Sequence, residues 1–160
     1  VEYINALQAL GYEHYEISNY AKSNFQSKHN SAYWEHIPYL GLGTGAHSFI
    51  NNKRQWNTPY VSKYIEGINN NKPNFDFEIL NKTDLYNEFL MQRLRTSEGI
   101  NIEKLENKFG STSKKISEQA FQKEISLGNM IFEYPIYRLT TQGKLFSDKV
   151  ISNCMIVNKK

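Results

Sequence analysis

Cysteine is almost absent from this sequence, since Cys154 is the single thiol among 160 residues. One thiol excludes an internal disulfide and any metal site built from several cysteines. A lack of disulfides is typical of proteins in a reducing compartment, so the sequence predicts a cytoplasmic protein. Long apolar runs are also missing. No stretch approaches the roughly 20 residues that a membrane-spanning helix needs, and no membrane span is expected.

An excess of one charge is missing too. The 19 basic and 16 acidic residues leave a formal net charge of +3, which is too small to indicate nucleic-acid binding by itself. Hydrophobic residues make up 39% of the chain and charged residues 22%, a composition typical of a globular protein. Aromatic residues reach 14%, which suits a core of large rings or a pocket for a flat ligand.

The first half of the chain alternates between helical and extended patterns, judged from the spacing of its apolar residues. The expected elements are a helix over 2–10, a strand over 12–17, a long connection over 18–38, strand and turn over 39–50, a strand over 53–56, and a helix capped by Thr58 that runs to Asn69. The polar run over 69–73 then breaks the pattern. We therefore expect a domain boundary after residue 72.

The second half predicts helices, then a strand pair, then a helix. Thr83 and Asn101 are expected to cap the first two helices, because short polar side chains accept hydrogen bonds from the first turn. The expected elements are a helix from Thr83 through Leu94, a helix from Asn101 to Phe109, a helix over 112–125, strands over 130–134 and 136–139, and a helix capped by Thr140 that carries Met155. This order predicts a winged-helix-like module.

Three motifs stand out when they are taken in order. Residues 15–21 read YEISNYA, residues 29–34 read HNSAYW and are followed by PYLGLGTGAHS over 38–48, and residues 139–146 read LTTQGKLF. Together they resemble the C-terminal part of the oxygen-independent coproporphyrinogen III oxidase family. The His-Asn-x-x-Tyr-Trp stretch resembles the haem-chaperone, HemW-type branch of that family. This resemblance spans nearly the whole chain.

The resemblance implies an α+β fold. Residues 1–72 would be the C-terminal part of a partial β/α radical-SAM barrel, and residues 73–160 a mainly helical, winged-helix-like domain. Proteins of this family use S-adenosyl-L-methionine (SAM) and a [4Fe–4S] cluster held by a Cys-x-x-x-Cys-x-x-Cys loop. That loop is lacking here, and one cysteine cannot supply the thiolates that a cluster needs. The chain is therefore expected to be a piece of a longer protein, unable to run radical chemistry alone.

Two sets of site residues follow from the resemblance. Ala21, Gly43, Ala46 and His47 would contact SAM. Gly41, Gly43 and Gly45 have an alternative explanation. They would form a tight strand–turn in which the missing side chains relieve crowding. His29, Asn30, Tyr33 and Trp34 would contact haem, with His29 as the ligand of the haem iron, because a neutral imidazole is a common axial ligand. The alternative for His29 is an ordinary loop histidine.

Other polar residues offer weaker candidates. Glu13 and Glu16 flank a strand and are the right type for a general acid or base, although a solvated or ion-paired carboxylate is the more ordinary state. Arg54 and Trp56 form a basic–aromatic pair suited to a carboxylate. A DNA-binding regulator would use the basic residues of the second half, Lys114, Lys115, Lys123, Arg138 and Lys144. Interspersed glutamates argue against nucleic acid as a partner.

The sequence thus predicts part of a tetrapyrrole-handling protein. The first function is a haem-binding chaperone that passes haem to an accepting apoprotein. The alternative is a SAM-dependent oxidase that decarboxylates coproporphyrinogen III. A winged-helix DNA-binding regulator is the second alternative. The intact motif that begins at His29 favours the chaperone.

Overall fold

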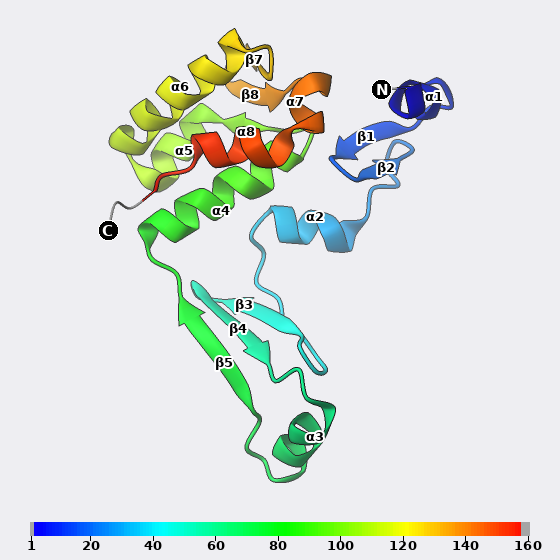
Figure 1. Cartoon of the computed structure of the whole chain (residues 1–160), viewed down its shortest axis with the longest axis vertical. Coiled ribbons are helices and arrows are strands. Elements are labelled where there is room, and N and C mark those ends of the chain that lie inside the picture. The colour runs from blue at the N-terminus through cyan, green and yellow to red at the C-terminus, as the bar shows by residue number, and fades with distance from the viewer. Residues whose placement is uncertain (1, 158–160) are drawn as a thin grey trace. The chain divides into compact units, whose positions relative to one another are not determined.

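The computed structural model describes residues 2–157 and mixes helices with strands (Figure 1). The chain divides into two compact units. The core unit combines the residues up to His36 with those from Tyr86 onward, and the middle unit is Ile37–Leu85. No helix within residues 2–157 is long and apolar enough to cross a membrane.

The N-terminal part of the core unit is a helix, a hairpin and a second helix. The elements are α1 (Glu2–Ala9), β1 (Glu13–Glu16), β2 (Asn19–Ala21) and α2 (Lys28–Trp34). The first helix and strand confirm the expectation, whereas the long connection predicted over 18–38 is wrong. β2 pairs antiparallel with β1, and Ser27 caps α2 by accepting a hydrogen bond from the Asn30 amide at 3.2 Å. That capping serine is a local signal the sequence analysis missed.

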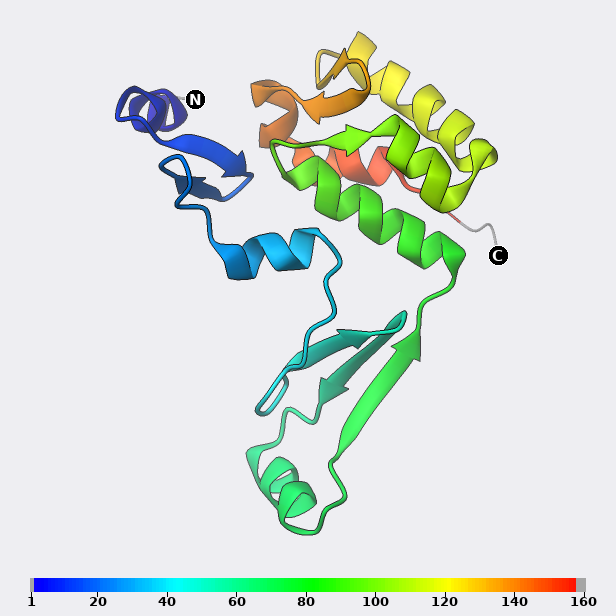
Figure 2. The ribbon, with the colours of Figure 1, turned by 180° about the vertical axis from the view of Figure 1, so that it is seen from behind.

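The C-terminal part of the core unit packs helices around a small sheet (Figures 1 and 2). Its elements are α4 (Lys82–Arg95), β6 (Ile100–Asn101), α5 (Ile102–Phe109), α6 (Ser111–Ser126), β7 (Met130–Glu133), β8 (Ile136–Leu139), α7 (Thr141–Leu145) and α8 (Ser147–Cys154). The antiparallel sheet has the order β6–β8–β7. Asn101 caps α5 and Thr140 caps α7 as predicted. Asn81, not Thr83, caps α4.

The hydrophobic core lies in this C-terminal part. Tyr86, Leu90 and Leu94 follow one face of α4 at intervals of four residues, and the two leucines are fully buried. Each fully buried large apolar side chain contributes about 1.5–3 kcal/mol to folding. Phe146 separates α7 from α8, so the single last helix expected from the sequence is two helices.

The middle unit is a three-stranded antiparallel sheet with one helix. Its elements are β3 (His47–Ile50), β4 (Lys53–Asn57), α3 (Val61–Asn69) and β5 (Phe75–Ile79), and the strand order is β3–β4–β5. The predicted cap at Thr58 is wrong, because α3 begins at Val61 and Tyr60 occupies the capping position without a side-chain bond. β5 was not predicted, although Phe75, Phe77 and Ile79 alternate with acidic residues, as strands require.

These elements confirm the mixed α and β class. Every strand pairing within residues 2–157 is antiparallel. The C-terminal part of a partial β/α radical-SAM barrel, expected for residues 1–72, stays a prediction. The winged-helix description of residues 73–160 also stays a prediction. The boundary after residue 72 is likewise untested; β5 lies beyond it and pairs with β4 before it.

Candidate functional site

Helix α2 carries the residues predicted to contact haem. His29 is exposed, and its imidazole meets the Tyr33 ring edge-on with the ring centroids 4.9 Å apart. Residues four apart share one face of a helix, which explains this contact. The Asn30 amide donates to the Ser27 cap, so Asn30 lies in the first turn beside His29.

Trp34 lies on a different face of α2. At 3.6 residues per turn, five positions turn the helix so that Trp34 is roughly 140° from His29. The Arg95 guanidinium stacks over the Trp34 ring at 5.6 Å. The Trp34 indole N–H is buried and has no acceptor within residues 2–157. The four predicted haem residues therefore share one helix, but His29 and Tyr33 form a pair from which Trp34 is separated.

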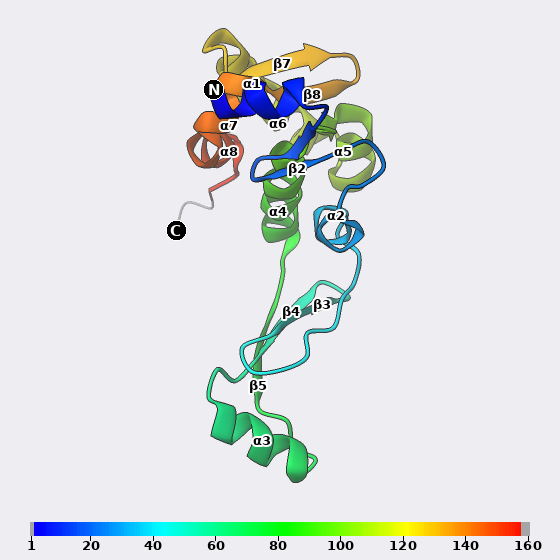
Figure 3. The same cartoon turned by 90° about the vertical axis from the view of Figure 1, so that its right-hand side faces the viewer.

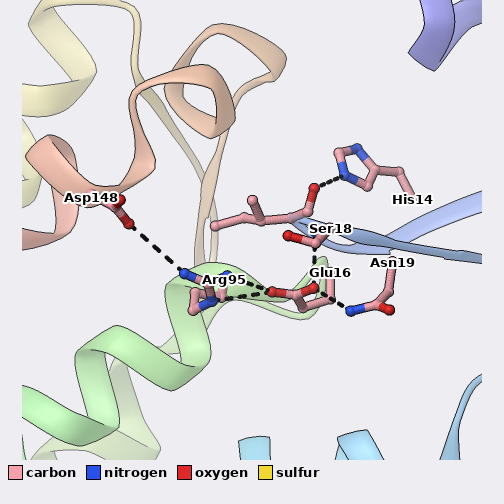
Figure 4. Close-up of polar contacts among 7 residues, drawn as sticks. His14, Glu16, Ser18, Asn19, Arg95 and Asp148 are labelled. Atoms are coloured by element: carbon pink, nitrogen blue, oxygen red, sulfur yellow. Dashed lines mark hydrogen bonds and ion pairs between the residues drawn. The ribbon is translucent and has the colours of Figure 1, made fainter.

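A buried carboxylate forms the centre of the polar network in Figure 4. Glu16 is only 1% exposed. Its carboxylate accepts hydrogen bonds from the Ser18 amide at 2.9 Å and the Asn19 side-chain amide at 2.6 Å. It also accepts from Nε and Nη2 of Arg95 at 3.1 and 3.0 Å. Asp148 lies 3.8 Å from the same guanidinium.

This network assigns Glu16 a structural role. The two contacts with Arg95 hold the β1–β2 hairpin to the end of α4, 79 residues further along the chain. The bonds from Ser18 and Asn19 lie within the hairpin and fix the carboxylate there. The Ile17 amide donates to the Arg95 carbonyl at 3.0 Å and reinforces the junction. Of the two states considered for Glu16, acid–base group or ion pair, the geometry favours the ion pair. Glu13, at the exposed start of β1, is not part of the network.

His14 and Lys144 form a second junction in the core unit. The His14 ring stacks on Tyr20 with centroids 4.3 Å apart, and its Nε2 donates to the Ile17 carbonyl at 2.9 Å. The Lys144 ammonium donates to the His14 carbonyl at 3.3 Å. Burial lowers the pKa of His14 and that of Lys144, because removal from water disfavours both charged forms.

The residues predicted to contact SAM fall in both units. Ala21 ends β2 in the core unit and is buried. Gly43 and Ala46 lie in the loop before β3, and His47 is the first residue of that strand, all in the middle unit. His47 is exposed, and its ring lies 6.1 Å, centroid to centroid, from the Trp56 ring.

The glycine loop before β3 uses its backbone groups internally. The Gly43 amide donates to the Tyr64 hydroxyl at 3.1 Å, and the Gly43 carbonyl accepts from the Asn57 side chain at 2.8 Å. The Gly45 and Ala46 amides donate to backbone carbonyls. A Cβ on Gly41 would lie 2.1 Å from the His47 carbonyl oxygen. The strand–turn alternative thus accounts for the glycine at position 41.

The residues present do not fit an iron–sulfur cluster. Cys154 is 1% exposed on α8, and burial raises its pKa to about 12. A thiolate is needed to ligate iron. Within residues 2–157 no three His, Cys, Asp or Glu side chains gather as a metal site.

Three of the remaining candidates form ion pairs within the chain. Arg54 pairs with Glu78 across β4 and β5 at 2.8 Å. Among the basic residues considered for DNA, Lys114 pairs with Glu106 and Arg138 with Glu133, both at 2.7 Å.

Comparison with known proteins gives a consistent result. Residues 80–146 match the family model of the HemN C-terminal domain. The chain is 36% identical over 116 residues to "Heme chaperone HemW" of Lactococcus lactis subsp. lactis, covering 72% of this chain and 30% of that protein. It is 31% identical over 150 residues to the protein of the same name from Bacillus subtilis, covering 92% and 39%. The chain thus spans about a third of the length of these relatives.

One solved structure has a similar fold. Coproporphyrinogen III oxidase (HemN) from Escherichia coli, described as a radical SAM enzyme, superimposes with a TM-score of 0.71. The match covers 96% of this chain and 39% of that protein at 14% sequence identity. At this identity the likeness concerns the fold alone.

Proposed function

Because this chain belongs to the HemN/HemW-like family, we propose that it forms part of a haem-binding chaperone. The relatives named above carry that function in their names. The observation that carries the proposal is the exposed imidazole of His29 on α2, held edge-on to Tyr33. Haem is the cargo in this proposal, and a haem-accepting apoprotein would be the partner.

His29 would bind the haem iron through a neutral ring nitrogen. The edge-on contact with Tyr33 leaves the imidazole ring restricted on one side, and the position on a capped helix fixes its backbone. Such a ring can meet an iron atom from solvent without unfolding its surroundings. Tyr33 supplies an aromatic surface beside the ligand, which suits a flat porphyrin. Trp34, which lies round the helix, is left out of this arrangement.

A haemin titration followed by Soret absorption tests the proposal. The wild-type chain should bind saturably with a shifted Soret band, and His29→Ala should lose the shift and weaken binding at least about tenfold, equal to about 1.4 kcal/mol. His47→Ala is the matched control. His47 is also an exposed histidine, but it lies in the middle unit rather than in the core unit. Equal binding by all three proteins would show non-specific adsorption and would end the role of His29.

SAM and a [4Fe–4S] cluster belong to the proposal for the whole protein. The SAM contacts of Ala21, Gly43, Ala46 and His47 rest on the family motif and remain proposed. The winged-helix description is supported by the element order α4–β6–α5–α6–β7–β8. Neither decarboxylation of coproporphyrinogen III nor DNA binding is favoured by a specific observation, since the likeness to the oxidase concerns the fold alone.

A further inference from the structure

A cleft of about 610 Å³ lies in the core unit between α2, α4, α5 and β8. Figure 3 shows α2 near α4 and α5, and these three helices contribute nearly half of the residues of its wall. Trp34, Phe89 and Ile136 give the wall an apolar part, and Lys104 and Lys108 give it ammonium groups. The volume falls in the range of ligand sites, and the wall is mainly polar and charged, which suits a ligand that carries charged groups.

The two arginines of the cleft are already engaged. Arg93 pairs with Glu98 at 2.5 Å and donates to the Gly99 carbonyl at 3.3 Å. Arg138 pairs with Glu133 at 2.7 Å. These ion pairs neutralise both guanidinium groups and fix them as parts of the wall.

The two lysines of the cleft, unlike its two arginines, form no ion pair among the described residues. Lys104 and Lys108 are four residues apart on α5, so their side chains share one helix face. Within residues 2–157 neither ammonium has a carboxylate partner within 4 Å. Apart from Glu98, which is paired with Arg93, the acidic residue of the wall is Glu35, which caps the end of α2. The two lysines outnumber it, so the cleft keeps an excess of positive charge.

The ammonium group of Lys108 is partly buried. Its ammonium lies over the Phe89 and Phe109 rings, 5.3 and 5.4 Å from their centroids. Burial of the ammonium lowers the pKa of Lys108, although the residue as a whole is exposed. A partly desolvated cation without a counter-ion gains more from an arriving anion than a fully hydrated one does.

Trp34 lines the same wall and carries a neutral donor that has no partner within residues 2–157. Its indole N–H is buried and finds no acceptor among the described residues. A buried donor without a partner costs about 1–3 kcal/mol. The N–H is closed to solvent, so a ligand oxygen would satisfy it once the Trp34 ring shifts toward the cleft.

We propose that this cleft binds the carboxylate groups of an organic ligand through the ammonium groups of Lys104 and Lys108 and the indole N–H of Trp34. The identity of the ligand as a propionate-bearing tetrapyrrole rests on the proposed function. The site is separate from the iron ligand, because His29 lies on another face of α2 and is not part of this wall.

Metal-free protoporphyrin IX is the probe, and its dimethyl ester is the matched ligand without carboxylates. The ¹⁵N-labelled chain contains two tryptophans, so its two indole signals are resolved and then assigned with Trp34→Phe. Protoporphyrin IX should shift the Trp34 signal and leave that of Trp56, which lies in the middle unit, in place. The ester should bind at least tenfold more weakly.

Two double variants with the same loss of charge complete the test. Lys104→Ala/Lys108→Ala should weaken protoporphyrin IX binding at least tenfold. Lys115→Ala/Lys123→Ala, on the exposed face of α6, should bind as the wild type does. Equal affinity for acid and ester, an unmoved Trp34 signal, or equal losses in both double variants would each overturn the proposal. Because the probe contains no iron, failure here and failure of the His29 test are separate results.

Discussion

Glu16→Ala is expected to lower the free energy of unfolding of the core unit by about 3 kcal/mol. The carboxylate is 1% exposed and accepts bonds from two amides and twice from Arg95. Removing one partner of a buried ion pair typically costs about 3–5 kcal/mol, because the other charge stays behind without compensation. The Arg95 side chain is 24% exposed, and Asp148 lies 3.8 Å from its guanidinium. Water and Asp148 would still partly compensate the charge of Arg95, so the expected loss is at the low end of that range.

Urea unfolding followed by Trp34 fluorescence measures this loss. A Trp56→Phe background makes Trp34 the sole tryptophan, and Trp34 reports on the junction because Arg95 stacks over its ring. Glu16→Gln keeps the shape and one acceptor while removing the charge, so it should fall between Glu16→Ala and the wild type.

Glu133→Ala is the control for an ion pair at the surface. Its carboxylate lies 2.7 Å from Arg138, but its side chain is 69% exposed. Exposed pairs contribute about 0–1 kcal/mol, and the loss should be correspondingly small. If Glu16→Ala and Glu133→Ala lowered the free energy of unfolding equally, burial would not decide the strength of the Glu16 pair, and the reasoning would be refuted.

Three further changes test other parts of the core unit. Burial holds the pKa of His14 below its ordinary value of 6.5, so the unfolded state binds more protons and stability should fall as the pH drops below 6.5; His14→Gln should flatten that dependence in urea titrations. Gly143→Ala would place a Cβ 1.9 Å from the Asn129 carbonyl oxygen, and thermal unfolding should show a loss of about 1–3 kcal/mol. Tyr86→Phe removes the buried hydroxyl that donates to Ser117 at 2.8 Å and should cost about 1 kcal/mol in urea.

Each of these has a result that would contradict it. If the free energy of unfolding of His14→Gln kept the wild-type dependence on pH, a group other than His14 would be responsible for that dependence. A wild-type melting temperature in Gly143→Ala would mean that the turn before β7 yields to the added methyl group. Tyr86→Phe should leave folding intact, because Ser117 still donates to the Ser113 carbonyl at 2.9 Å; a neutral or stabilising effect would show that the hydroxyl is not needed in the core.

Local signals in the sequence determined many of the elements. Asn101 accepts hydrogen bonds from the Glu103 and Lys104 amides, and Gly110 and Gly128 adopt positive φ at the ends of α5 and α6. These interactions join residues only a few positions apart, so their pattern is visible in the sequence. Similar local signals at Ser27 and over Phe75–Ile79 were missed, and the strand and helix they mark were therefore not predicted.

The candidate haem residues show where such reasoning stops. His29, Tyr33 and Trp34 lie close together in the sequence motif, which implied that all three contact haem on one surface. Once the segment is a helix, the period of 3.6 residues separates Trp34 from the other two. The sequence supplied the residues, but the helix decided which of them can act on one ligand.

The sequence by itself determined the family, the capped helices of the second half, and the lack of thiolates for an iron–sulfur cluster. Only the tertiary structure decided that Glu16 meets Arg95 and that Trp34, Lys104 and Lys108 line one cleft. The partners in these contacts are tens of residues apart. Their meeting depends on how helices and hairpin pack around the common core, and no short-range pattern along the chain records that packing.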